Sequence, residues 1–248
     1  MTRVTLDAER RQPIIAFAMI DIRPFSSLGH ANHGWLDAHH HFSFANYYDP
    51  ARMGWGRIRV WNDDAIGPKS GFPPHPHRDM EIVTYVRTGA ITHQDSMGNK
   101  GRTAAGDVQV MSAGTGVMHA EYNLEDEQTT LFQIWIETDK PSTPPSWGAM
   151  PFPKESRSGA FQLLASGDSA DGSLTINSDA KVLGATLKAG QSISLDADPS
   201  RHLYLVPSGR VKVNGHEAHA RDGIAITAEN RLEIDAEEDS ELVLVDAR

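Results

Sequence analysis

The stretch Glu81-Ile82-Val83-Thr84-Tyr85-Val86 is a short run of mostly β-branched and aromatic residues, with turn-forming residues on either side. Similar runs follow at residues 108–111 (Val-Gln-Val-Met) and 131–136 (Leu-Phe-Gln-Ile-Trp-Ile). The second half continues the pattern at residues 193–195, 203–206, 211–213, 224–226 and 241–245. Because helical periodicity is scarce, strands at this spacing predict an all-β protein built as an antiparallel sandwich or barrel.

A proline-rich stretch divides the 248 residues into two unequal halves. Five prolines lie between Pro141 and Pro153, and proline resists both helix and central strand. All five tryptophans lie before residue 150 and nine of the twelve histidines precede this stretch, so the chemistry should lie in the first half. A faint repeat of strand, glycine turn, strand, loop and strand surrounds Gly89 and again Gly209. We expect a first barrel, a linker and a second barrel of the same type at residues 1–140, 141–155 and 156–248.

The composition disfavours several classes of protein. A net charge of −10 argues against binding to nucleic acid or to an anionic membrane, because both require a positive surface. The absence of cysteine excludes disulfides, iron–sulfur clusters, thiolate zinc sites and cysteine nucleophiles. No run of 18 apolar residues exists, and the N-terminal residues Met1 to Asp7 lack the apolar core of a signal peptide. We therefore expect a cytoplasmic protein.

Two short motifs carry the strongest chemical signal. Residues 74–77 read Pro-His-Pro-His, and residues 119–123 read His-Ala-Glu-Tyr-Asn. Residues two apart share a face of a strand. The side chains of His75 and His77 should therefore lie on one face, and so should those of His119 and Glu121. Two such strands facing each other would bring three imidazoles and a carboxylate together, a donor set that suits a first-row divalent metal. A lone His-x-His pair arises often by chance, but the second motif 42 residues later favours a metal site.

Other histidines and aromatic residues are more typical of packing. His93 begins a hairpin loop and is expected to make a structural hydrogen bond. The run His39-His40-His41 alternates between two faces on an extended chain, which argues against joint chelation. The aromatic residues between Trp35 and Trp55 are interpreted as packing. In the second half, Leu195, Ala197, Ala236 and Glu238 occupy the positions that correspond to the four candidate ligands, which predicts a second barrel without a metal.

The two motifs resemble those of the cupin proteins, and longer strings narrow the resemblance. The strings are His33-Gly34-Trp35-Leu36-Asp37, residues 42–50 (Phe-Ser-Phe-Ala-Asn-Tyr-Tyr-Asp-Pro), residues 93–100 (His-Gln-Asp-Ser-Met-Gly-Asn-Lys) and residues 112–116 (Ser-Ala-Gly-Thr-Gly). They are similar to the pirin family of bicupins, close to its short bacterial branch associated with quercetin 2,3-dioxygenase activity. The resemblance runs from about Gly29 to the C-terminus and is dense up to Glu137. It implies two cupin (double-stranded β-helix, or jelly-roll) barrels packed together.

The resemblance also implies a set of metal ligands. In the pirin pattern the acid of His-x-Glu is the fourth ligand, so His75, His77, His119 and Glu121 would hold one divalent transition metal. The resemblance favours Fe(II), while Ni, Co, Mn, Cu and Zn remain chemically possible. Glu81, the ligand in most metal cupins, lies four residues after His77 and is expected on the same strand face. It would either orient an imidazole or be a buried acid that accepts backbone hydrogen bonds.

The function implied by the resemblance is that of a metal-dependent dioxygenase. Such an enzyme would cleave a flavonol-like, quercetin-type polyphenol with dioxygen and release carbon monoxide. Glu121 or a nearby acid would accept the proton of the substrate hydroxyl. The alternative is a non-catalytic, metal- or redox-sensing pirin that regulates a protein partner. A third possibility is a sugar-phosphate isomerase, which would need a cationic side chain such as Arg87 beside His77.

Overall fold

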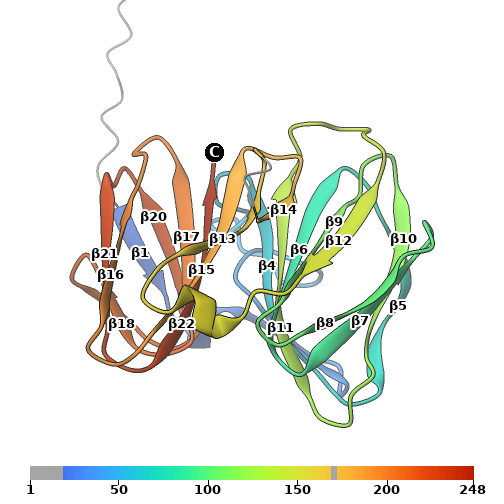
Figure 1. Ribbon diagram of the computed structural model, residues 1–248, viewed down its shortest axis with the longest axis horizontal. Coiled ribbons are helices and arrows are strands. Elements are labelled where there is room, and N and C mark those ends of the chain that lie inside the picture. Colours follow the sequence, from blue (N-terminus) through green and yellow to red (C-terminus); the bar gives the residue numbers. More distant parts are fainter. Residues whose placement is uncertain (1–18, 169–171) are drawn as a thin grey trace, which may run out of the picture.

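The computed structural model describes residues 19–168 and 172–248, and these consist almost entirely of β-strands (Figure 1). Residues 1–18 and 169–171 lie outside the described part, which therefore does not include the N-terminal residues expected to lack a signal peptide. The helical elements of the described residues are two short 3-10 turns, η1 (Phe25–Ser27) and η2 (Lys154–Arg157). In this part of the chain no helix has the length and apolar character needed to cross a membrane.

The first barrel is a seven-stranded sheet packed on a four-stranded sheet. The larger sheet has the order β12-β9-β6-β11-β4-β3-β2, and the smaller has the order β5-β10-β7-β8. The strands are β2 (Gly29–Asn32), β3 (Leu36–His40), β4 (Ile58–Ile66), β5 (Ser70–His77), β6 (Met80–Thr88), β7 (Ala90–Asp95), β8 (Lys100–Ala104), β9 (Val108–Ser112), β10 (Val117–Asn123), β11 (Thr129–Glu137) and β12 (Ser146–Met150).

The second barrel repeats this arrangement. Its seven-stranded sheet has the order β1-β20-β17-β22-β15-β13-β14, and its four-stranded sheet has the order β16-β21-β18-β19. The strands are β1 (Met19–Arg23), β13 (Gln162–Ser166), β14 (Leu174–Thr175), β15 (Ala180–Leu187), β16 (Ser192–Asp196), β17 (His202–Pro207), β18 (Val211–Val213), β19 (His216–Ala218), β20 (Gly223–Thr227), β21 (Arg231–Ala236) and β22 (Ser240–Ala247). The prediction of an all-β protein with two packed barrels is confirmed.

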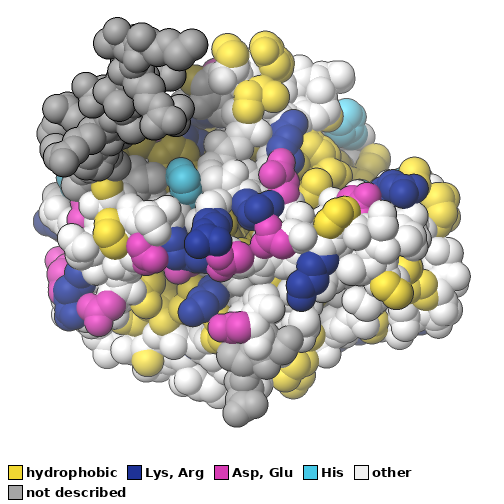
Figure 2. All heavy atoms as spheres, turned by 90° about the horizontal axis from the view of Figure 1, so that it is seen from above, with side chains coloured by type: hydrophobic (Ala, Val, Ile, Leu, Met, Phe, Trp, Pro, Cys, Tyr) yellow, Lys and Arg dark blue, Asp and Glu magenta, His cyan; other side chains and the backbone are white. Residues whose placement is uncertain are grey.

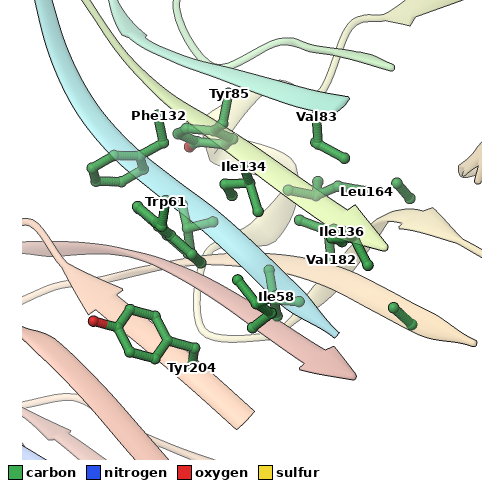
Figure 3. Close-up of a cluster of buried hydrophobic side chains, with 14 of the residues drawn as sticks. Ile58, Trp61, Val83, Tyr85, Phe132, Ile134, Ile136, Leu164, Val182 and Tyr204 are labelled. Atoms are coloured by element: carbon green, nitrogen blue, oxygen red, sulfur yellow. The ribbon is translucent and has the colours of Figure 1, made fainter. Parts of the chain in front are cut away.

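The two seven-stranded sheets pack against each other through one shared apolar core (Figure 3). Alternation along β11 sends Phe132, Ile134 and Ile136 into this core, which also contains Leu164 and Val182 of the second barrel. The intervening positions of β11 point the other way, into the interior of the first barrel. The outer face of the first barrel's large sheet therefore binds the second barrel, and its inner face is free to build a site.

Two elements differ from the expected division of the chain. Strand β1 precedes the first barrel in the sequence but pairs with β20 of the second barrel, from Met19–Thr227 to Arg23–Gly223. The proline-rich segment, expected to be a linker that resists helix and central strand, contains β12, which pairs with β9 at the edge of the first large sheet. The prolines lie outside β12, and an edge strand needs hydrogen bonds on only one side.

The surface of the molecule carries charges of both signs. On the face seen in Figure 2, basic and acidic side chains lie beside one another rather than in separate patches. Exposed ion pairs such as Lys188–Asp239 (2.8 Å) and Lys69–Asp126 (2.9 Å) add little stability individually, because water screens them. The visible face thus presents no broad surface of a single sign.

Candidate metal centre

Strands β5 and β10 bring the two histidine motifs together. They pair antiparallel in the small sheet of the first barrel, with His119 opposite His75 and Val117 opposite His77. β5 is an edge strand, which explains how it tolerates three prolines. Gly71 allows the close approach of the two strands, because a Cβ at this position would lie 2.2 Å from the backbone oxygen of Glu121. Local alternation and this register together place His75, His77 and His119 on one inner surface.

The three imidazoles form a compact group. Nitrogen atoms of His75, His77 and His119 lie within 4.8 Å of one another, and the Nε2 atoms of His75 and His119 are 3.0 Å apart. Burial and the neighbouring imidazoles lower the pKa of His77 to about 4 and that of His119 to about 2. Both rings are therefore neutral at pH 7, which is the form that binds a metal ion.

The hydrogen bonds of the outer ring nitrogens assign the tautomers. His75 Nδ1 donates to the carbonyl oxygen of Pro73 at 2.7 Å, which leaves His75 Nε2 with a lone pair. His93 Nε2 lies 3.0 Å from the Asp95 carboxylate, which only accepts, so His93 Nδ1 is an acceptor for His119 Nδ1 at 3.3 Å. His119 Nε2 thus also carries a lone pair.

The residues fit a bound cation. Two nitrogen lone pairs 3.0 Å apart repel each other unless a positive charge lies between them. Nitrogen ligands lie about 2.1 Å from a transition metal, so adjacent ligands of one ion are about 3.0–3.4 Å apart. The observed separation of His75 Nε2 and His119 Nε2 matches this range.

Glu121 lies beside this group rather than within it. One carboxylate oxygen of Glu121 is within 4.8 Å of a His119 nitrogen and a His93 nitrogen, in a second cluster. Its carboxylate accepts hydrogen bonds from Gln133 Nε2 (2.6 Å), Gln109 Nε2 (2.7 Å) and Thr84 Oγ1 (3.3 Å). Burial raises the pKa of Glu121 to about 7, although these hydrogen bonds oppose the shift. The structure thus brings three of the four expected ligands into one group and places the fourth next to His119.

The expected positions of Glu81 and Arg87 are wrong. β5 ends at His77, and a turn through Asp79, whose φ is 47°, starts the new strand β6 at Met80. Glu81 consequently shares its face with residues of the core between the barrels, and its carboxylate accepts a hydrogen bond from Ser112 Oγ at 2.5 Å. Arg87 lies on the same outer face, ion-paired with Asp63. Neither side chain reaches the histidines, so the requirement for a phosphate-binding cation beside His77 is not met by Arg87.

An apolar cavity of about 290 Å³ adjoins His75 and His77. A second hollow of about 560 Å³ shares part of its lining but does not reach His75 or His77. The residues common to both are Leu36, Ala38, His40, Phe44 and Phe72. Some of the aromatic residues between Trp35 and Trp55, which were expected to serve packing, therefore also line the cavity. His40, expected to be structural, lines it too, and its Nδ1 atom lies 2.8 Å from Asn62 Oδ1.

Several polar residues of the site were not identified from the sequence. Asn62, Asp64 and Gln133 line the cavity, and Gln109 binds Glu121. Each belongs to a strand that is otherwise mostly apolar, and Asn62 and Asp64 are two residues apart. A search for polar residues at alternating positions of buried strands would have found them. His93 makes a hydrogen bond, as expected; its partner is Asp95, and His93 also contacts His119.

The second barrel has a different interior. Its core is aliphatic and includes Ala236, with Leu195 and Ala197 packed against it. Within residues 19–168 and 172–248, the groups of side chains that could hold a metal all lie in the first barrel or on its β2–β3 hairpin.

Comparisons with known proteins cover both barrels. Residues 21–136 match the family described as Pirin, and residues 163–247 match the family described as quercetinase C-terminal cupin domain. A pirin-like protein of Caulobacter vibrioides is 63% identical over 231 residues, covering 92% of this chain and 100% of the relative. An Escherichia coli (strain K12) protein named quercetin 2,3-dioxygenase is 46% identical over 230 residues, covering 92% and 98%. The crystal structure of the bacterial pirin YhhW from Escherichia coli in complex with nickel(II) has a TM-score of 0.87 and 43% identity, covering 92% and 99%.

Proposed function

Because the chain belongs to the pirin family, we propose that it is a metal-dependent dioxygenase that opens the ring of a flavonol-like polyphenol and releases carbon monoxide. The observation that carries the proposal is the group of three histidines beside an apolar, aromatic-lined cavity. The first barrel, expected at residues 1–140, holds the site. The second barrel, expected at residues 156–248, is metal-free and supports the first through the shared core.

His75, His77, His119 and Glu121 hold one divalent transition metal per chain. The lone pairs of His75 and His119 support this assignment, and so does the nickel(II) in the related pirin. The family resemblance favours Fe(II) as the native metal. When bound, the ion supplies a Lewis acid that lowers the pKa of a coordinated hydroxyl and a redox centre for chemistry with dioxygen.

Glu121 takes the proton of the substrate's 3-hydroxyl on a carboxylate oxygen. Burial disfavours the charged carboxylate of Glu121, which suits a group that accepts a proton. Gln133 and Gln109 fix the carboxylate through their amide donors, and Trp135 Nε1 holds Gln133 in turn through a hydrogen bond of 3.2 Å. These residues position the base without adding charge to the cavity.

The cavity orients the ring and excludes water. Phe44, Phe72 and Trp135 line it, and His77 packs edge-on against Trp135 with ring centroids 4.9 Å apart. A flat aromatic molecule with few polar atoms buries well against such walls, and the two connected hollows are of the size usual for small-molecule sites. The chemistry of the walls thus favours a polyphenol over a sugar phosphate.

The test uses protein loaded in turn with Fe, Ni, Co, Mn or Cu. Anaerobic addition of quercetin should shift its absorbance to longer wavelength, and oxygen should then bleach that band and release carbon monoxide. A flavone without the 3-hydroxyl should give neither signal. Elemental analysis should find one ion per chain; a value near two would contradict the metal-free second barrel.

Two variants make the test specific. His77→Ala should lose the ion and all turnover, whereas His216→Ala, in the second barrel, should keep both. If fully metallated protein leaves quercetin intact with every metal, the dioxygenase proposal fails. A non-catalytic, metal-sensing regulator would then be the better description.

A further inference from the structure

Asp64 is a buried acid on the cavity wall opposite the histidines. It lies on β4 of the seven-stranded sheet, two residues after Asn62, and only 2% of it is exposed. The histidines His75 and His77 lie on β5 of the four-stranded sheet, and the same cavity is lined by all four residues. A ligand that fills the cavity from the histidines therefore meets Asp64 on the other side.

One oxygen of the buried Asp64 carboxyl, Oδ1, lacks a hydrogen-bond partner among the described residues. Several buried polar atoms of the described residues lack a hydrogen-bond partner. Among them, only Asp64 Oδ1 belongs to a residue that lines this cavity. The preceding residue behaves differently, because Asp63 points to the opposite face and pairs with Arg87 and Arg221. A buried carboxyl oxygen without a hydrogen-bond partner is costly, and a ligand hydroxyl in the cavity would offset that cost.

We propose that Asp64 is a positioning residue that binds a hydroxyl group of the substrate remote from the group held at the histidines. For the identity of the substrate this rests on the proposed function, since a flavonol carries both a chelating 3-hydroxyl and further ring hydroxyls. The ligand class is a flat, mainly apolar aromatic molecule with a hydroxyl at its far end. The aromatic walls hold its rings, and Asp64 selects its orientation.

The chemistry of the carboxyl suits this role. Burial raises the pKa of Asp64 well above its usual range, and the nearby Asp63 and Glu121 act in the same direction. A neutral acid both donates and accepts hydrogen bonds, as a hydroxyl does. An asparagine at this position would offer the same two functions, whereas valine or alanine would offer neither.

The first experiment compares two flavonols on nickel(II)-loaded protein without oxygen. Quercetin carries several ring hydroxyls, and 3-hydroxyflavone carries only the chelating one. Asp64→Val should weaken quercetin binding about tenfold and change 3-hydroxyflavone binding less than twofold. Asp64→Asn should keep quercetin affinity within about threefold of the wild type. Glu81→Gln, which alters a buried carboxyl outside the cavity, serves as the control, and Asp64→Ala replaces the valine variant if that variant does not fold.

A second experiment separates this proposal from the proposed function. Metal-free protein is titrated with 2-naphthol and with naphthalene, which differ by one hydroxyl. The wild type and Asp64→Asn should prefer 2-naphthol, and Asp64→Val should bind both equally. Such a result stands even if no metal form cleaves quercetin, in which case only the dioxygenase proposal fails. The Asp64 proposal is overturned if the wild type binds neither probe, or if the preference for hydroxylated ligands survives in Asp64→Val and Asp64→Ala.

Discussion

Replacing Glu121 by Gln should remove a pH dependence of stability from the metal-free protein. Burial raises the pKa of Glu121 to about 7 from an ordinary value of 4.5. The folded protein therefore holds this proton more tightly than the unfolded chain. The cost of ionising the buried carboxyl is absent below pH 4.5, grows as pH rises towards 7, and is complete above pH 7. Its full size is about 3 kcal/mol.

The assay is urea unfolding of chelator-treated protein, followed by circular dichroism at pH 5, 6, 7 and 8. Relative to Glu121→Gln, the wild type should lose about 2–3 kcal/mol of unfolding free energy between pH 5 and pH 8. His77 and His119 have lowered pKa values of their own, but both variants contain them, so their effects cancel in the difference. Stability curves that stay parallel from pH 5 to pH 8 would refute the assignment of Glu121 as a desolvated acid.

Saturating nickel(II) provides the control for this experiment. A bound cation beside His119 favours the ionised carboxylate, so the metal should restore the wild type at pH 8 more than it restores the variant. Equal stabilisation of both proteins would show that Glu121 does not interact with the ion.

Three further predictions concern the support of the site. His93→Phe keeps an aromatic ring but removes the acceptor for His119 Nδ1. The affinity for nickel(II), measured by competition with a chelator, should fall about 10–100-fold. An unchanged affinity would contradict the tautomer assigned to His119. Gly71→Ala should push β5 away from β10 and lower both the metal affinity and the Tm. Gly148→Ala is the control: its Cβ would lie 3.5 Å from its nearest neighbour, so metal affinity and Tm should change little. Leu164→Ala should cost about 2–5 kcal/mol and shift one transition common to both barrels; two separate transitions would argue against the shared core.

The sequence by itself determined the elements and the chemical character of the first barrel. The alternation of a strand is a property of the local backbone, so His75 and His77 had to share a face, as did His119 and Glu121. The short β-branched runs predicted the strands, and the pirin resemblance predicted the two barrels, both of which are confirmed. The aliphatic residues at the corresponding positions of the second half, such as Leu195, likewise indicated an apolar interior there.

Only the tertiary structure decided which side chains face the histidines. A single turn at Asp79 reversed the face expected for Glu81, because a strand break changes the direction of every residue after it. Asp64 and Gln133 join the site from β4 and β11, which belong to the opposite sheet from the histidine motifs, and their place depends on the register of β3, β4 and β11. Strand β1 pairs with β20 of the second barrel, and this pairing also depends on contacts between residues distant in the sequence. Register and strand partners are set by contacts between residues distant in the sequence, whereas alternation along one strand is set by its own backbone.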